Sequence, residues 1–180
     1  LTKIWNVNNF LKVNKCTFDG VIKPKNLKLN INKWIYNELI ETKILTENFI
    51  KNYRFDEAAK TIYKFVWNTY CDWYLELSKT ILLSKNNSDI KEIKTTSGQV
   101  FKEILILLHP FIPFITEELW LRNKLKTKNT KYLMYSNWIS LKKLKTDKSI
   151  QSVNEIIELI SSVRSFKNEL NVSPGSFVDI

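Results

Sequence analysis

Apolar residues recur every three or four positions through most of the chain, a spacing that is typical of helices with one buried face. The segments that carry this spacing are residues 1–14, 33–52, 53–83, 99–111, 113–124 and 149–170. The pattern therefore predicts an all-α protein, a helical bundle.

The segment 53–83 differs from the others because it is apolar on two faces. One stripe includes Ile62 and Val66, and a second stripe includes Trp67 and Tyr74. A helix that is apolar on two faces is buried on two sides. This segment is therefore expected to be the central helix of the bundle.

Polar and turn-forming residues indicate where the helices begin. Asn30 or Asn32 is a candidate N-cap for the second helix, and residues 95–97 are candidates for the fourth. Residues 84–98 are accordingly expected to form a polar hinge, while Pro113 suits the first turn of the next helix.

The C-terminal pattern predicts two domains. Residues 1–148 are expected to form the bundle, ending in a basic crossing loop over 125–148. Residues 149–180 indicate a helix, a turn and a strand at 177–180, which starts a small α/β appendage. Because the first residue is not Met and this strand has no partner, the chain is expected to be a piece of a longer protein.

Composition narrows the class of partner. The chain has 3 Gly and 4 Pro, too few for the turns of a β-sandwich or barrel. Its 28 Lys and Arg against 18 Asp and Glu give a net charge of +10, which favours nucleic acid first and anionic membranes second. Cys16 and Cys71 form no disulfide or zinc motif, and no run reaches the ~18 apolar residues of a membrane span. A cytoplasmic location is expected.

Asp72 and Glu76 lie among aromatic residues and raise the question of catalysis. Paired carboxylates cleave glycosidic bonds from opposite sides, usually from different elements, whereas these two share one helix face. We therefore expect them to be structural, as buried or half-buried acids paired with Arg54, Arg164 or a lysine that fix how helices dock. Trp73 is expected to belong to the same structural set.

No catalytic or metal site is expected elsewhere. The chain has no Gly-rich phosphate loop, no HExxH motif, and no nucleophile with a base and an orienting partner. The one histidine, His109, stands at the end of a predicted helix and is expected to cap it or pack there.

Lys3, Asn6 and Phe10 form the candidate binding face on the first helix. Aromatic rings stack on unpaired bases, amides read base edges and cations take phosphates, so this mixture suits single-stranded RNA. Core packing is the alternative role for Phe10.

Four stretches resemble one protein family, in the family's order. The sequence HPFIPFITEELW, residues 109–120, resembles a motif of the anticodon-binding bundles of class I aminoacyl-tRNA synthetases for Val, Ile and Leu. YRFDEAAKTIYKFVWNTYCDWYLELSK is similar to the signature helix of the valyl-tRNA synthetases. KIWNVNNF and SVRSFKNELNVSPG resemble that family's entry into the domain and its last helix and turn.

The resemblance implies the anticodon-binding domain of a bacterial valyl-tRNA synthetase. It implies tRNA(Val) as partner, with no DNA and no membrane, and catalytic and editing domains upstream in the same chain. The parent enzyme would attach valine using ATP with Mg, whereas this fragment would hold no cofactor and no catalytic residue. A monomer is expected.

The family also implies site residues. A lysine and a phenylalanine of its entering segment contact anticodon bases, and the matching residues are Lys3 and Phe10. Asn9 stands where the family usually has Arg, and Lys167 stands where a second Arg follows Arg164, which loses forked hydrogen bonding. The expected tRNA-binding residues are Lys3, Asn6, Asn9, Phe10, Lys12, Arg164 and Lys167.

Three other functions stay open. The domain could belong to an isoleucyl or leucyl synthetase, although CDWYLELSK argues against this. A basic helical interaction module would bind acidic partners or membranes without anticodon preference. A carboxylate hydrolase would use Asp72 and Glu76.

Overall fold

The computed structural model describes residues 2–18, 23–125, 131–138 and 148–173, and the regular structure within them is helical. The elements are α1 (Thr2–Val13), η1 (Pro24–Asn26), α2 (Asn30–Lys51), α3 (Phe55–Lys64), η2 (Phe65–Leu75), α4 (Glu76–Leu82), α5 (Asn87–Leu108), α6 (Pro113–Arg122), η3 (Leu133–Tyr135) and α7 (Lys148–Glu169). The predicted all-α bundle is confirmed.

Contacts within the chain divide it into two units, residues 1–145 and 146–180. The bundle lies in the first unit, and the second contains α7. The expected strand at 177–180 lies outside the described residues, so the start of an α/β appendage stays a prediction. The same is true of most of the crossing loop, whose described part contains η3.

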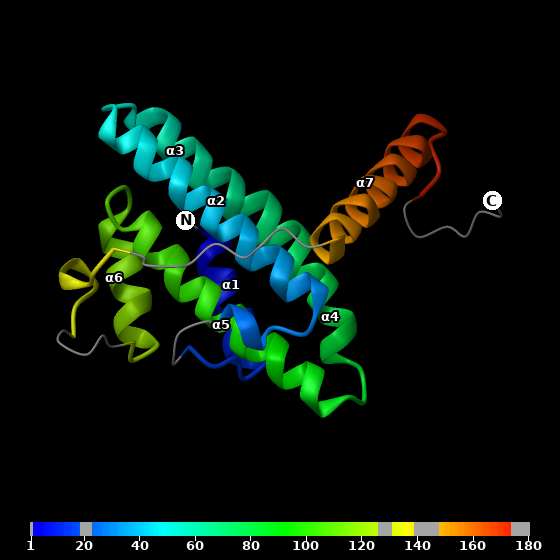
Figure 1. Ribbon diagram of the computed structural model, residues 1–180, viewed down its shortest axis with the longest axis horizontal. Coiled ribbons are helices and arrows are strands. Elements are labelled where there is room, and N and C mark those ends of the chain that lie inside the picture. Colours follow the sequence, from blue (N-terminus) through cyan, green and yellow to red (C-terminus); the bar gives the residue numbers. More distant parts are fainter. Residues whose placement is uncertain (1, 19–22, 126–130, 139–147, 174–180) are drawn as a thin grey trace. The chain divides into compact units, whose positions relative to one another are not determined.

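The helix α5 is the most enclosed element of the first unit. It is buried without interruption from Thr96 to Phe101 and again from Ile104 to Leu108. The neighbours that pack on it are α1, α2, α3, α4 and α6 (Figure 1). The sequence pattern assigned this central place to residues 53–83, which are buried on two sides as predicted, but α5 carries the longer buried runs.

The stretch 55–82 is one continuous run of helix in three parts. Its middle, η2, is π-helical, a wider form that is often found at functional sites. In Figure 1 α2 and α3 lie side by side along their length, and both η2 and α5 also contact α2. Tyr70 and Tyr74, fully buried and stacked at 5.6 Å between ring centroids, form the aromatic core of the stretch.

The start of α5 corrects the predicted hinge. Asn86 is the N-cap, and its side chain accepts hydrogen bonds from the backbone N–H of Ser88 at 3.0 Å and of Asp89 at 3.4 Å. The cap expected at 95–97 was wrong, because these residues are already helical. At Gly98 the backbone of another segment approaches so closely that no side chain would fit.

The start of α2 has no side-chain N-cap of its own, so the prediction of Asn30 or Asn32 was wrong. Glu92 of α5 instead fixes the backbone that leads into the helix. Its carboxylate accepts from the backbone N–H of Lys28 at 3.1 Å and of Leu29 at 3.0 Å. It also accepts from the side-chain amide of the buried Asn32 at 2.9 Å.

A buried polar chain continues from Asn32. The Tyr74 hydroxyl donates to Oδ1 of Asn32 at 2.8 Å and accepts from the Ser97 hydroxyl at 3.3 Å. The Tyr70 hydroxyl donates to the carbonyl of Ser97 at 2.7 Å. Burial raises the pKa of both phenols well above the usual value, so both stay protonated donors. These residues are the buried polar contacts that join α2, η2 and α5.

Candidate nucleic-acid interface

A groove of about 190 Å³ lies between α1 and the stretch formed by η2 and α4. Its lining residues are Lys3, Asn6, Val7, Phe10, Cys71, Asp72, Leu75, Glu76 and Lys79. Lys3, Asn6 and Phe10, which the sequence placed on one helix face, therefore meet in one place.

The buried side of α1 fixes how this face is presented. Ile4, Val7, Asn8 and Leu11 are buried, which is the spacing of one helix face. Asn8 also accepts, through Oδ1, a hydrogen bond of 2.6 Å from the side-chain amide of Asn123 after α6. The groove residues of α1 flank this anchored side.

Two ion pairs line the groove. Lys3 Nζ lies 2.7 Å from Asp72 Oδ1, with 36% and 55% of the two side chains exposed. Lys79 Nζ lies 2.7 Å from Glu76 Oε1, with 48% and 54% exposed. All four side chains therefore line the groove and are partly exposed.

These contacts correct the structural role predicted for the two acids. Asp72 is paired with a lysine and does join two helices, but it is exposed rather than buried. Glu76 pairs within its own helix and so joins nothing. Trp73 is only half-buried, and its neighbours Tyr70 and Tyr74 occupy the core in its place.

Phe10 lies beside the charges, half-buried, with Lys79 Nζ 5.9 Å from its ring centroid. This is within the range of a cation–π contact. Cys71 forms part of the apolar wall, and burial raises the pKa of its thiol to about 12, so it is a neutral side chain rather than a nucleophile. The ring offers a stacking surface and the lysines offer donors.

The other flank of α1 carries a second aromatic and cationic cluster. The Arg122 guanidinium of α6 lies 4.8 Å from the ring centroid of Trp5. Lys12 Nζ lies 3.5 Å from the backbone carbonyl of Arg122, and Asn9 is exposed. Asn9 and Lys12 therefore do not line the groove.

Sequence reasoning missed Lys79 and Arg122 as site residues. Lys79 follows Glu76 by three positions, so a helical projection from the acids would have placed it on the same face. Arg122 begins the basic stretch RNKLKTKNTK, residues 122–131, whose charge suits RNA. Its contact with Trp5 could not be found from local spacing, because it joins segments far apart in the sequence.

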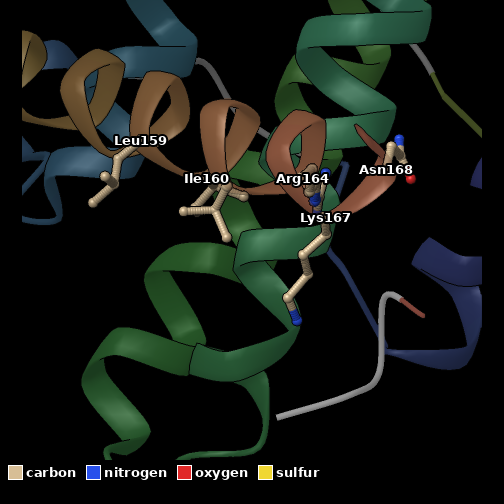
Figure 2. A pocket seen from close by; sticks show the side chains of 6 residues that line it. Leu159, Ile160, Arg164, Lys167 and Asn168 are labelled. Atoms are coloured by element: carbon tan, nitrogen blue, oxygen red, sulfur yellow. The ribbon is translucent and has the colours of Figure 1, made fainter. Parts of the chain in front are cut away.

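Arg164 and Lys167 lie on α7 in the second unit. They share one side of that helix with Leu159, Ile160, Val163 and Asn168, as Figure 2 shows for the labelled residues. The structure thus brings these two cations together with each other.

His109 behaves as predicted. It ends α5, and its Nδ1 lies 2.8 Å from the hydroxyl of Thr116 on α6. Within the described residues, no group of three or more His, Cys, Asp or Glu is arranged to hold a metal ion. In the same part of the chain, every helix is too short or too polar to cross a membrane.

The chain matches a family model described as the anticodon-binding domain of tRNA ligase, over residues 32–180. A valine–tRNA ligase of Pelagibacter ubique is 57% identical over all of this chain and 20% of its own length. Those of Bartonella henselae and Brucella suis are 41% and 36% identical, over 76% and 99% of this chain and 15% and 20% of their own lengths. The chain thus spans at most a fifth of the length of these curated relatives.

Proposed function

Because the chain belongs to the family of anticodon-binding domains of tRNA ligases, we propose that it binds a tRNA anticodon in the groove between α1 and the η2–α4 stretch. The observation that carries this proposal is the meeting of Phe10 with Lys3 and Lys79 at one groove. An aromatic face with cations beside it suits an unpaired base and its phosphate.

Each groove residue has a role in this binding. Phe10 stacks on a splayed base, Asn6 hydrogen-bonds a base edge, and Lys3 and Lys79 take phosphate oxygens. Asn9, Lys12 and the pair of Arg122 with Trp5 extend the contact along the other flank of α1. Arg164 and Lys167 supply further contacts from α7.

The parent protein in this proposal is a valine–tRNA ligase, and the bound RNA is tRNA(Val). The names of the relatives support both points. The parent attaches valine with ATP and Mg through catalytic and editing domains that precede this segment, and this chain contributes recognition alone, with no cofactor of its own. We also propose that the parent protein is a cytoplasmic monomer.

The test is RNA binding by this chain over a series of salt concentrations. The probes are the anticodon stem-loop of valine tRNA and the same stem-loop with the middle anticodon base changed. Phosphate contacts alone give steep salt dependence without preference. We expect a preference for the valine anticodon that persists at moderate salt.

Phe10→Ala should weaken binding and remove that preference, because stacking on the ring, which contributes about 1–3 kcal/mol per base, holds the base where its edge can be read. Phe55→Ala is the matched control, because Phe55 is 54% exposed on α3 and does not line the groove. Equal, salt-sensitive binding of both RNAs would refute anticodon reading and leave a general polyanion-binding bundle.

A further inference from the structure

Phosphate binding does not explain why Asp72 and Glu76 line the groove. Both carboxylates are more than half exposed, and both line the groove beside Phe10. Negative charge at this position repels an RNA backbone. Their exposure also argues against a purely structural role, because exposed ion pairs contribute little to stability.

We propose that these two carboxylates select the base that enters the groove, by accepting a hydrogen bond from its exocyclic amino group. The groove then favours a base that presents an amino group at its edge, such as adenine or cytosine, and disfavours uracil, which has no amino group. This inference rests on the proposed function and adds to it the chemical property of the base that is selected.

Distances place the acceptors near the stacking ring. Lys79 Nζ is 2.7 Å from Glu76 Oε1 and 5.9 Å from the Phe10 ring centroid, so one ammonium group lies between the carboxylate and the ring's surroundings. Asp72 lies one turn earlier on the same face and is tied to Lys3 across the groove. A base stacked on Phe10 therefore has carboxylates at its edge.

Carboxylates discriminate by hydrogen-bond polarity. An ionised carboxylate only accepts, and the amino groups of adenine and cytosine donate. Uracil presents a carbonyl oxygen at the corresponding position, which leaves two acceptors facing each other. Each carboxylate has about four lone-pair sites, so it can hold its lysine and accept from a base at the same time.

Lys3 and Lys79 keep the two carboxylates from repelling RNA. Lys3 and Lys79 balance the two acids, which leaves these four residues with no net charge. The RNA backbone is then not driven out, and a base with an amino group finds an acceptor that is already positioned.

The primary test changes single atoms of the RNA and uses the unaltered chain. Adenine in the valine anticodon is replaced by purine, which lacks the 6-amino group, and cytosine by 2-pyrimidinone, which lacks the 4-amino group. We expect at least one of these deletions to weaken binding about tenfold, as for loss of a hydrogen bond to a charged group.

The second part repeats the comparison with D72N/E76Q. An amide presents its oxygen or its nitrogen with equal ease, so the effect of deleting the amino group should fall below about twofold. The control is D56N/E57Q, which changes the net charge equally at residues outside the groove and should keep the full effect. For each protein, the affinity for the unmodified RNA is divided by the affinity for the RNA without the amino group. This ratio is compared between proteins, because removing two acids tightens the binding of all RNA.

The outcomes separate the inference from the proposed function. The inference is supported if deleting an amino group weakens binding to the unaltered chain, and if D72N/E76Q removes this effect while D56N/E57Q keeps it. If neither deletion affects the unaltered chain, or if D72N/E76Q retains the effect, the inference is overturned, while a loss of preference in Phe10→Ala still supports anticodon binding. If Phe10→Ala also changes nothing, both fail.

Discussion

Gly98→Ala tests the close contact between the backbone of Thr17 and helix α5, where packing and helix propensity have opposite effects on stability. Within a helix, Ala is more favourable than Gly by about 1 kcal/mol, so propensity alone predicts a more stable protein. A Cβ added at Gly98 would lie 2.1 Å from the carbonyl oxygen of Thr17, 2.7 Å from its carbonyl carbon and 3.3 Å from the backbone nitrogen of Phe18. The obstructing atoms belong to backbone, which cannot rotate away as a side chain would.

The size of the effect follows from what must move. Carbon and oxygen need roughly 1 Å more separation than this, so the loop after α1 has to shift away from α5. The Phe18 ring, 6.2 Å from that of Phe101, would shift with it. Overpacking costs about 1–3 kcal/mol, and this case should lie near the upper end because backbone has to move. After the gain in propensity is subtracted, we expect a net loss of about 2 kcal/mol.

The assay is urea unfolding of the 180-residue chain, followed by circular dichroism. The midpoint should fall while the slope stays constant, because the area exposed on unfolding does not change. Lys91→Ala, at an exposed position of α5, is the control and should shift stability by only a few tenths of a kcal/mol. A Gly98→Ala protein as stable as wild type, or more stable, would refute the close packing of this loop on α5.

Two further predictions concern carboxylates of α5. Glu92→Ala removes the acceptor of the Lys28 N–H and the Asn32 amide, so it should lower the free energy of unfolding in urea by about 2–3 kcal/mol. The control is Glu118→Ala, which removes an exposed ion pair within one helix and should cost below about 1 kcal/mol. Equal losses in the two variants would contradict the role of Glu92 at the start of α2. Burial raises the pKa of Glu103 to about 7 from 4.5, so the unfolded state ionises first and stability falls as pH rises between these values. Glu103→Gln should remove this fall, about 3 kcal/mol in all, and parallel pH–stability curves for the two proteins would show that Glu103 does not retain its proton on folding.

Much of the fold could be predicted because it depends on local periodicity. The spacing of apolar residues placed α1, α2, α6 and α7 close to their observed bounds. Pro113 marked the first turn of α6. The shared face of Lys3, Asn6 and Phe10 followed in the same way, since residues three, four and seven apart lie together on a helix.

The rest depended on contacts between distant segments. Residues 96–98 are small and polar, which indicates a hinge locally, yet they are buried in α5, where the loop at Thr17 packs on Gly98. The acceptor that fixes the backbone before α2 is likewise Glu92, about sixty residues away in the chain. No window of sequence contains both partners of such a contact, so propensity and capping rules could not find them.

The exposure of Asp72 and Glu76 shows how the two kinds of information combine. Their spacing predicted a shared face correctly, but whether that face is core or surface depends on where α1 lies. Since α1 leaves a groove there, the acids pair with Lys3 and Lys79 and cancel their charge locally. The net charge of +10 must then reside on the rest of the chain. In the proposed function, charge outside the groove therefore supplies most of the attraction to RNA and its salt dependence, while the groove, with no net charge on these four residues, contributes mainly through which base it accepts.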